Sequence, residues 1–484
     1  MSEINGIKNA DGLNNTQKDI IDNLVRVYNK NLSRNQMLHE YYDGDITITD
    51  FGVEVDKEAL KDDAVCYWPQ KAVDVLAERI RFDGFVFADG KTVDDTLNAI
   101  VKRNKMVSAY ERFLPSKLIH GCLFACVNNV DDKAEIKFHS AETAAAIPDG
   151  NHDSGTIGAG MVIAKSATTS WSKHRQVPTV VNVYLPGQII VISRITKSKW
   201  VAEINNIEER SPMMFAFTHK ANGHKPFGVS RITKAVRGYT RAAMRTMYHM
   251  EASGTFYAFP KYALMGLTDE QYDSMVNKKM KAYVDSVLLG TRDDDGHSPT
   301  PYQFSGNSPQ PFIEELRCYA GFVSGATGVP LTSLGIVQDN PSSADAMTAA
   351  REDLCVMAQK DADNDKEVLN KLITMALAVE NNLTVNELLD KYPIYDGIMA
   401  HTQSPFIYSK ASKADSAMKI ASVAPWFTNT DVFLEELDFD QPTIARMRRA
   451  RDEYNASATL DALISSMAGE AEPTTETMES GDGS

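Results

Sequence analysis

Residues 230–256 read SRITKAVRGYTRAAMRTMYHMEASGTF, an unbroken helical pattern that spans about 40 Å at 1.5 Å per residue. Apolar side chains recur along one side of this helix: Ile232, Val236, Tyr239, Ala243, Met247 and Met250. Basic side chains fall within a separate arc of about 120°: Arg231, Lys234, Arg237, Arg241 and Arg245. Five bases and one acid give residues 229–256 a net charge of +4.

Two interpretations of this basic face stay open. In the first, the bases are solvated or pair with acids of a neighbouring helix or subunit, for example Glu314 and Glu315. In the second, they form a stripe that faces a polyanion. Aromatic residues are not interleaved with the bases, which argues against a platform for stacking nucleobases.

A second helical segment follows an insertion at residues 257–310. It begins at Pro311, ends near Ala326, and reads PFIEELRCYAGFVSGA. Two antiparallel helices would hold the insertion away from the body like a stalk, and Gly321, Gly325 and Gly328 favour a close approach of helices. Because the second helix has too few apolar residues for a core of its own, such a stalk needs neighbours, and we expect a homo-oligomer. A coiled-coil arm in a monomer is the alternative.

The parts on either side of the stalk differ in character. Before it, helical patterns at residues 14–43, 66–81 and 93–120 precede Val- and Ile-rich runs at about 121–218, which indicates an α+β unit with its helices first. After it come a loop, a helix at residues 342–381 and further helical sequence to about residue 468. The acidic tail at 468–484 is predicted to be disordered.

Composition limits the classes of function. The 484 residues carry a net charge of -15, whereas a free-standing DNA-binding domain is usually basic. Contact with nucleic acid would therefore need a local basic feature or a surface that binds it only weakly. No stretch resembles a signal peptide or reaches the roughly 20 apolar residues of a membrane span, so we expect a soluble intracellular protein without membrane contact.

Enzyme and metal signals are absent from the sequence. Met161 stands where a phosphate-binding loop needs Lys, and neither a zinc-protease helix nor a Gly-x-Ser-x-Gly elbow occurs. Alternating acids begin like a calcium loop but lack its glycine and final Glu, which predicts a solvated helix face: Asp361, Asp363, Asp365 and Glu367. Cys122 and Cys126 are interpreted as buried apolar residues. We therefore predict no catalytic residue, no metal and no cofactor.

Several short stretches, taken in their order, resemble the portal proteins of tailed double-stranded DNA bacteriophages of the long-tailed type. The resemblance extends from about residue 14 to about residue 455. The stretches that carry it are Tyr41-Tyr42-Asp43-Gly44, Lys225-Pro226-Phe227-Gly228-Val229-Ser230-Arg231-Ile232, Thr327-Gly328-Val329-Pro330 with Leu334-Gly335, and Asn340-Pro341-Ser342-Ser343-Ala344-Asp345-Ala346 leading into Ala349-Ala350-Arg351.

The resemblance implies an α+β, portal-type fold that forms a dodecameric ring around a channel for double-stranded DNA, contacted without sequence preference. Its parts would be an α/β wing at 1–225, a first stem helix at 226–256, a small α/β clip at 257–310, a second stem helix at 311–327, a tunnel-loop region at 328–341, a long tunnel helix returning to the wing at 342–407, a helical crown at 408–467 and the tail.

The resemblance also implies roles and partners. The five stem bases would line the channel or pair between subunits, and the loop nearest the DNA would comprise Val337, Gln338, Asp339 and Asn340. The clip would dock the terminase packaging motor and later the head–tail adaptor proteins, while major capsid and scaffolding proteins would surround the ring. The protein would lie in the virion, and in the host cytoplasm during assembly.

Two rival functions remain. One is another oligomeric virion connector or a scaffold-associated protein. The other is an unrecognised intracellular enzyme, which would need a nucleophile and a base brought together by the fold, such as Cys122 beside His120 or His139.

Overall fold

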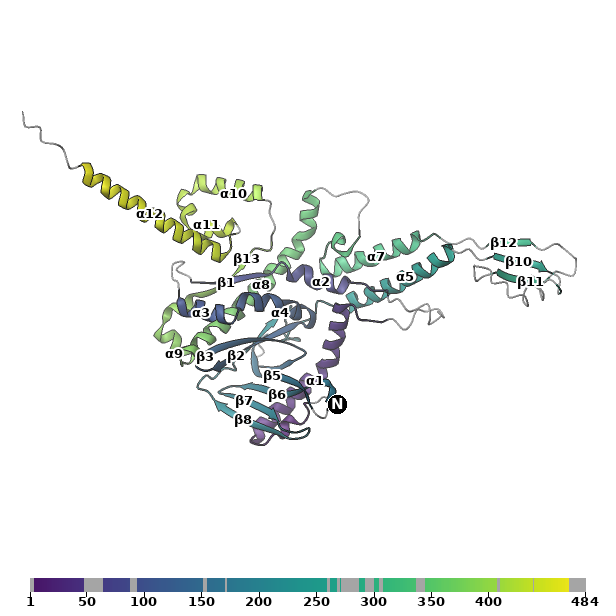
Figure 1. The fold of residues 1–484 in the computed structure, drawn as a ribbon, viewed down its shortest axis with the longest axis horizontal. Coiled ribbons are helices and arrows are strands. Elements are labelled where there is room, and N and C mark those ends of the chain that lie inside the picture. Colours follow the sequence, from purple (N-terminus) through teal and green to yellow (C-terminus); the bar gives the residue numbers. More distant parts are fainter. Residues whose placement is uncertain are drawn as a thin grey trace, which may run out of the picture.

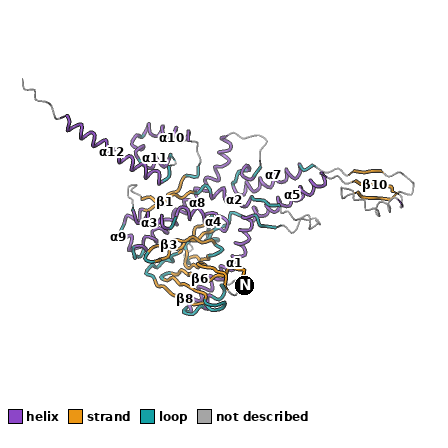
Figure 2. The backbone as a smooth tube through the Cα atoms, viewed as in Figure 1, coloured by secondary structure: helices purple, strands orange, loops and turns teal. Residues whose placement is uncertain are grey.

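The computed structural model describes residues 4–47, 64–87, 94–150, 155–169, 172–258, 262–267, 270, 287–291, 300–303, 308–336, 344–406, 410–437 and 439–469. A body of sheets and helices carries a long two-helix arm on one side and a group of helices on another (Figure 1). The body contains both helices and strands, purple and orange in Figure 2. The presence of both helices and antiparallel sheets confirms the predicted α+β class.

The helices and strands follow one another as predicted in outline. The helices are α1 (Asn15–Asp43), α2 (Trp68–Ala77), α3 (Asp95–Arg103), α4 (Met106–His120), α5 (Lys234–Ala258), α7 (Gln310–Thr327), α8 (Ala344–Glu380), α9 (Val385–Lys391), α10 (Lys410–Val423), α11 (Asp431–Glu436) and α12 (Gln441–Gly469). Short 3-10 helices lie at Ile7–Asn9, Leu331–Leu334, Pro393–Gly397 and Pro425–Asn429. The sequence within the insertion also predicts an amphipathic helix at 270–284, and these residues, apart from Glu270, lie outside the described part of the chain.

Helix α1 has clear signals at both ends. The side chain of Asn14 accepts a hydrogen bond from the backbone N–H of Gln17, and the Gln17 side chain accepts one from the Asn14 N–H, which is a capping box. Gly44 ends the helix in the left-handed region, at φ 80°, where a residue with a Cβ would be strained. The helix predicted at residues 14–43 therefore ends at the expected residue.

The strands form two main antiparallel sheets in the body. The larger has the order β4-β5-β6-β7-β8 and the smaller the order β3-β2-β9. Their bounds are β2 (Cys122–Val130), β3 (Lys133–Ser140), β4 (Ala144–Pro148), β5 (Ile157–Thr169), β6 (Ser172–Leu185), β7 (Gln188–Arg194), β8 (Trp200–Asn206) and β9 (Met214–Thr218). Nearly every Val- and Ile-rich run predicted at 121–218 is a strand of one of these sheets.

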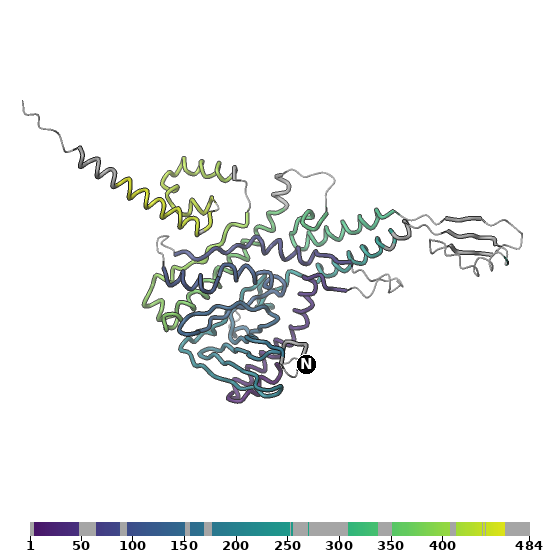
Figure 3. The backbone as a smooth tube through the Cα atoms, in the orientation of Figure 1, coloured from purple at the N-terminus to yellow at the C-terminus, as the bar shows by residue number. Residues whose placement is uncertain are grey.

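Two hydrophobic cores hold the body together. In one, α1 packs its buried Ile21 and Leu24 against Val181 and Ile190 of the larger sheet. In the other, α4 and α8 cover the smaller sheet, and side chains from regions far apart in the sequence meet there. Figure 3 shows the green α8 beside the much earlier, blue segments. The long helix after the arm is thus a core element of the body.

Two features of the body depart from the sequence prediction. The helix predicted at 93–120 is two helices, because Lys105 between them has φ 49° and breaks the helical path. A strand pair not predicted from the sequence joins β1 (Arg81–Phe87) to β13 (Ile398–Gln403), antiparallel. The chain after α8 therefore returns to the N-terminal part of the body.

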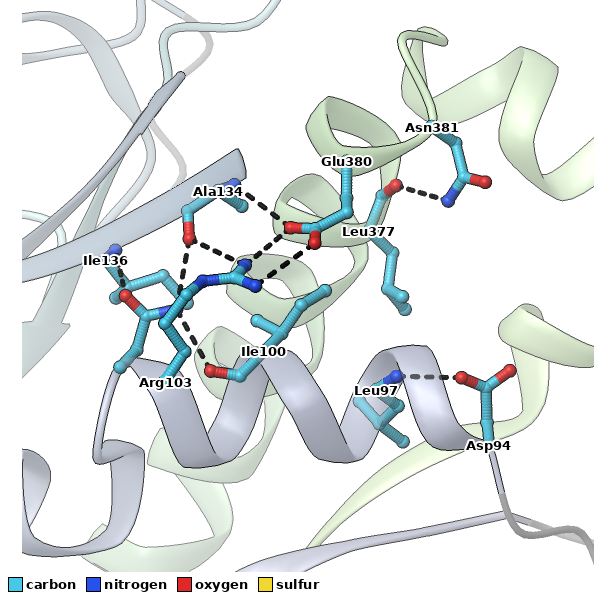
Figure 4. A network of polar contacts seen from close by, with 10 residues as sticks. Asp94, Leu97, Ile100, Arg103, Ala134, Ile136, Leu377, Glu380 and Asn381 are labelled. Atoms are coloured by element: carbon cyan, nitrogen blue, oxygen red, sulfur yellow. Dashed lines mark hydrogen bonds and ion pairs between the residues drawn. The ribbon is translucent and has the colours of Figure 1, made fainter. Parts of the chain in front are cut away.

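The end of α8 is fastened by a polar network (Figure 4). Arg103 of α3 donates from both terminal nitrogens to the Glu380 carboxylate, at 3.2 and 2.5 Å. The backbone of Ala134 in β3 donates to the same carboxylate at 3.0 Å and accepts from Arg103 at 3.2 Å. Charge-assisted, two-pronged contacts of this kind fix geometry, so α3, β3 and α8 are held in register.

The body and the arm meet at two glycines. Gly228 lies at φ 77°, and a Cβ there would come within 2.3 Å of the Gly121 carbonyl oxygen. A Cβ on Gly121, at φ 98°, would come within 2.9 Å of the Val229 backbone. The close approach of these two backbone segments therefore requires glycine on both sides. It explains the Lys225-Pro226-Phe227-Gly228 loop that precedes α5.

We predict an acid-sensitive stability of the body from His139 in β3. Burial above all, and Lys137 to a lesser degree, lowers the pKa of His139 from 6.5 to about 4. The folded state then binds fewer protons than the unfolded state between these values. The contribution of His139 to the free energy of unfolding is fully present above about pH 6.5. It falls by about 3 kcal/mol as pH drops toward 4.

The measurement is urea unfolding of the full chain at several pH values between 7 and 4. His139→Gln should reduce the loss of stability over this window, whereas His224→Gln, at an exposed histidine, should keep the wild-type profile. An unchanged pH profile for His139→Gln would contradict the assignment.

Candidate functional site

The arm consists of the antiparallel helices α5 and α7, with the small sheet β11-β10-β12 at its far end (Figure 1). The strands of that sheet are β10 (Tyr262–Leu267), β11 (Val287–Thr291) and β12 (Thr300–Gln303). Ala243 and Met244 of α5 are buried with Ala320 and Val323 of α7. These buried apolar side chains of the two helices therefore face each other.

Aromatic rings add to this contact. The Tyr239 ring of α5 stacks on Phe322 of α7, with centroids 5.1 Å apart, and on Tyr319 at 6.3 Å. Phe322 nevertheless stays 50% exposed. A Cβ added at Gly321 or Gly325 would meet no atom within 4 Å, so the predicted close approach at these two glycines does not occur within the subunit. They lie on the open side of α7.

Four of the five predicted bases lie on α5. Lys234 and Arg241 are exposed, and Arg237 and Arg245 are half-buried. In the part of the chain that the structure describes, no acid lies within ion-pair distance of Lys234 or Arg241. The arm thus presents positive charge that the described residues of its own subunit leave unpaired.

Arg237 and the acids of α7 have other contacts. Arg237 lies over the Tyr41 ring of α1, 6.0 Å from its centroid, and one terminal nitrogen is 3.2 Å from the Met37 sulfur. Glu314 accepts a hydrogen bond from Gln310 at 3.2 Å, and Glu315 accepts one from Tyr319 at 2.6 Å. Pairing of the bases with Glu314 and Glu315 is therefore not seen within the subunit.

Arg231 departs from the prediction that grouped it with the other bases. The helix predicted from Ser230 begins at Lys234, so Arg231 precedes α5 and does not share its face. Its side chain is buried and donates to the carbonyl oxygens of Ala72 and, at 2.6 Å, Thr327. Burial lowers the pKa of Arg231 to about 10, which leaves it charged at neutral pH. Arg231 joins α2, α5 and the end of α7.

The alternating acids of α8 also depart from the prediction. Asp363 and Glu367 are exposed, as expected, but Asp361 and Asp365 are buried at 3% and 1% exposure. Residues four apart share one face of a helix, and this face points into the body. The prediction of a solvated acidic face holds for only half of the set.

Each buried acid has a basic or polar partner from another element. Asp365 accepts a hydrogen bond from Lys117 of α4 at 2.6 Å and another from Tyr110. His219 lies 2.6 Å from Asp361 through its Nδ1. The pKa of Asp361 is lowered, because Lys117 and His219 outweigh the opposing effect of burial. This buried charge cluster, defined as Tyr110, Lys117, His219, Asp361 and Asp365, ties α8 to α4 and to the residue that follows β9.

The predicted loop residues Val337, Gln338, Asp339 and Asn340 lie outside the described residues. The described chain on either side ends at Ile336 and resumes at Ala344. On the near side, the Trp68 indole donates to the Leu334 carbonyl oxygen at 3.1 Å. Gly335 follows in the left-handed region at φ 84°.

The enzyme alternative gains no support from the cysteines. Cys122 and Cys126 are both buried, as predicted. Burial raises the pKa of Cys122 to about 12, and it raises that of Cys126 as well. A nucleophilic cysteine needs the opposite shift, because the thiolate is the reactive form. None of the helices in the described part of the chain has the length and apolar character needed to cross a bilayer.

Comparisons with known proteins point to one kind of protein. No protein-family model matches the chain. The portal protein of Mycobacterium phage L5 is 24% identical over 320 residues, which is 65% of this chain and 65% of that protein. The portal protein of Mycobacterium phage D29 is 22% identical over 331 residues, 67% of each chain. The chain thus spans about two thirds of the length of the curated relatives it matches.

Solved structures of low similarity were also found. The neck of a native GTA particle, computed with C12 symmetry, aligns with 75% of this chain and 88% of its own at 13% identity and a TM-score of 0.39. The neck of an empty GTA particle, computed with C6 symmetry, aligns with 65% of this chain and 78% of its own, at 13% identity and a TM-score of 0.38. The sequence matches to the two phage proteins carry the conclusion: the chain is a distant relative of the portal proteins of tailed bacteriophages.

Proposed function

We propose that this chain is the subunit of a phage portal: a dodecameric ring at one capsid vertex, through which the genome is packaged and ejected. The observation that carries the proposal is the sequence similarity to two phage portal proteins over about two thirds of the chain. The role is structural and non-enzymatic. The ring would lie in the virion, and in the host cytoplasm during assembly.

In this proposal the elements take the parts of a portal subunit. The body is the wing, α5 and α7 are the stem, and the sheet β11-β10-β12 belongs to the clip. Helix α8 runs from the tunnel loop into the wing, and β13 belongs to the wing because it pairs with β1. Helices α10, α11 and α12 form the crown. The tunnel-loop residues stay a prediction.

Exposed apolar side chains of the C-terminal helices support an oligomer. Val423 is 86% exposed, Trp426 70% and Tyr454 72%. Helix α12 extends away from the body (Figure 1), and its residues 449–459 are all exposed. Most of the stability of a helix in a protein comes from tertiary packing, which this part of α12 lacks within the described subunit. Neighbouring copies in a ring would cover these side chains.

Charge supports free passage of DNA. Every phosphate that a fixed cation neutralises adds an attraction, which must be broken when the duplex slides. A subunit with a net charge of -15 avoids this grip over most of its surface. Contact with double-stranded DNA would be independent of sequence.

The clip and the ring exterior would be the docking surfaces. The terminase motor would bind at the clip during packaging, and head–tail adaptor proteins would replace it afterwards. Major capsid and scaffolding proteins would surround the wing. The competing function, another virion connector or a scaffold-associated protein, shares the oligomer but lacks a channel for DNA.

The test is electron microscopy of the purified full chain in negative stain, with mass from light scattering on the same sample. We expect rings with a central hole and a mass near twelve times 53.5 kDa, or about 640 kDa. A monomer or dimer at every concentration, without rings, would contradict the proposal.

A further inference from the structure

A cluster of three metal-ligand side chains lies in the body, away from the arm. His39 belongs to α1, His120 is the last residue of α4, and Glu142 lies in the turn between β3 and β4. One candidate ligand atom from each residue lies within 4.8 Å of the other two. The three residues come from separate parts of the sequence, so no motif with a fixed spacing predicts the cluster.

The geometry converges on one carboxylate oxygen. His39 Nδ1 is 2.6 Å from Glu142 Oε1, and His120 Nε2 is 3.3 Å from the same oxygen. His120 is buried, Glu142 is half-buried, and the His39 side chain is 45% exposed. The cluster is therefore closed on the side of α4 and open to solvent on the side of α1.

This donor set matches zinc. Two imidazole nitrogens and one carboxylate oxygen are typical ligands of Zn²⁺, and tetrahedral Zn–N and Zn–O bonds of about 2.0–2.1 Å put neighbouring ligand atoms about 3.3 Å apart. His120 and Glu142 already have this separation. The shorter His39 contact is a hydrogen bond, and in a zinc site this ring, whose side chain is 45% exposed, would lie farther from Glu142. Magnesium and calcium prefer oxygen-only sites and fit poorly.

Neighbouring residues support the three ligands. Asp43 Oδ2 lies 3.4 Å from His39 Nε2, the ring nitrogen that faces away from Glu142. Ligating histidines usually have such a carboxylate on their second nitrogen, because it orients the ring. The Glu142 turn is held by Tyr28, whose hydroxyl donates to the Glu142 carbonyl oxygen at 2.9 Å, and by Asn35, which donates to the Ala141 carbonyl at 2.9 Å.

The electrostatics of Glu142 also suit a cation. Burial raises the pKa of this carboxyl, but hydrogen bonds from His120 and His39 outweigh it, and the pKa lies below its usual range. The carboxylate is thus ionised at neutral pH. Among the described residues His120 Nδ1 has no hydrogen-bond partner, so this buried ring makes its polar contact at the cluster alone.

We propose that His39, His120 and Glu142 bind one Zn²⁺ per subunit, with a solvent molecule at the fourth position. The ion would fasten α1 to the end of α4 and to the turn between β3 and β4. Its role would be structural, since it would join three segments that otherwise meet only through packing and hydrogen bonds.

The experiment is calorimetric titration of the full chain, freed of metal by a chelator, with zinc chloride at pH 7.5. We expect one Zn²⁺ per chain and a rise in Tm on binding, because a ligand that binds only the folded state stabilises it. Co²⁺ in place of zinc should give the visible absorption bands of a tetrahedral site. Mg²⁺ at the same concentration should leave Tm unchanged.

Variants separate this site from adventitious binding. His39→Ala, at an exposed side chain, and Glu142→Gln should each weaken zinc binding at least tenfold, and Asp43→Asn should weaken it about 10–100-fold. His224→Ala removes an exposed histidine outside the cluster and should bind like the wild type. Circular dichroism checks that each variant is folded. Absence of zinc binding by the wild type, or equal binding by folded His39→Ala, would overturn the proposal.

Discussion

Replacing Asp365 by Asn is expected to lower the free energy of unfolding of the body by about 3–5 kcal/mol, because the change leaves a buried charge without its partner. Lys117 is fully buried, and its ammonium group lies 2.6 Å from the Asp365 carboxylate. Asn has the shape of Asp and still accepts hydrogen bonds from Lys117 and Tyr110. The substitution therefore removes the charge and little else.

Replacing Lys117 by Met should lower the free energy of unfolding by less than replacing Asp365 by Asn. Lys117→Met strands the Asp365 carboxylate, but burial raises the pKa of this carboxyl even with Lys117 and Tyr110 opposing it. The acid can therefore take up a proton and lose its charge. The double variant, Asp365→Asn with Lys117→Met, should recover part of the stability, because no unpaired charge remains.

Urea unfolding of the four proteins, followed by circular dichroism, measures these effects as shifts of the midpoint at constant m. Asp363→Asn is the matched control on the same helix. Its side chain is 54% exposed and pairs with Lys366 at 2.9 Å, so the change should cost less than about 1 kcal/mol. Equal midpoints for Asp365→Asn and Asp363→Asn would contradict the role assigned to the buried pair.

The buried pair also shows where sequence analysis reaches its limit. Local patterns predicted α1 with its stop at Gly44, both arm helices and most strands of the body, because capping, periodicity and residue type act within a few neighbours. The burial of Asp365 depends on Lys117, which lies 248 residues away in the sequence. No local pattern of alternating acids contains that partner, and a solvated face was the wrong prediction.

The prediction that Arg231 shares the basic face of the helix was wrong for a related reason. Its spacing from Lys234 fits one helical face only if the helix already includes both residues, and α5 begins at Lys234. The close backbone contact between Gly121 and Gly228 sets the path of the chain before that start. Similarly, the pairing of β1 with β13 and the cluster of His39, His120 and Glu142 join segments that only the folded body brings together.

The four bases of α5 lead to the prediction with the largest effect on assembly. If all four bases of α5 lined the channel, twelve subunits would surround the duplex with rings of fixed cations. Only 6–10 phosphate contacts already change DNA affinity about 10³–10⁵-fold between low and moderate salt. Such a grip would oppose sliding, so on the proposed function we expect Arg241 and Arg245 to pair with a neighbouring subunit.

Ring symmetry locates the acidic counterpart of these bases. Rotation about a ring axis keeps the height of each residue. The hydrogen bond that Tyr319 donates to Glu315 raises the pKa of Tyr319, and Arg245 lies close enough to oppose this shift. With the arm along the axis, Glu315 of one copy would stand level with Arg245 of the next. The exposed acids of α7 would then face the basic side of α5 across a head-to-tail contact.

Arg241→Glu with Arg245→Glu is therefore expected to abolish rings and leave smaller species in light scattering and electron microscopy. Adding Glu314→Lys and Glu315→Lys should restore rings, because the charges across the contact are exchanged. Arg112→Glu with Lys133→Glu makes the same change in net charge at exposed positions of the body and should leave rings intact. Rings that persist in the first variant would contradict pairing of these bases between subunits and would assign the bases to the channel wall. The same substitution would then weaken DNA binding to assembled rings and reduce its dependence on salt.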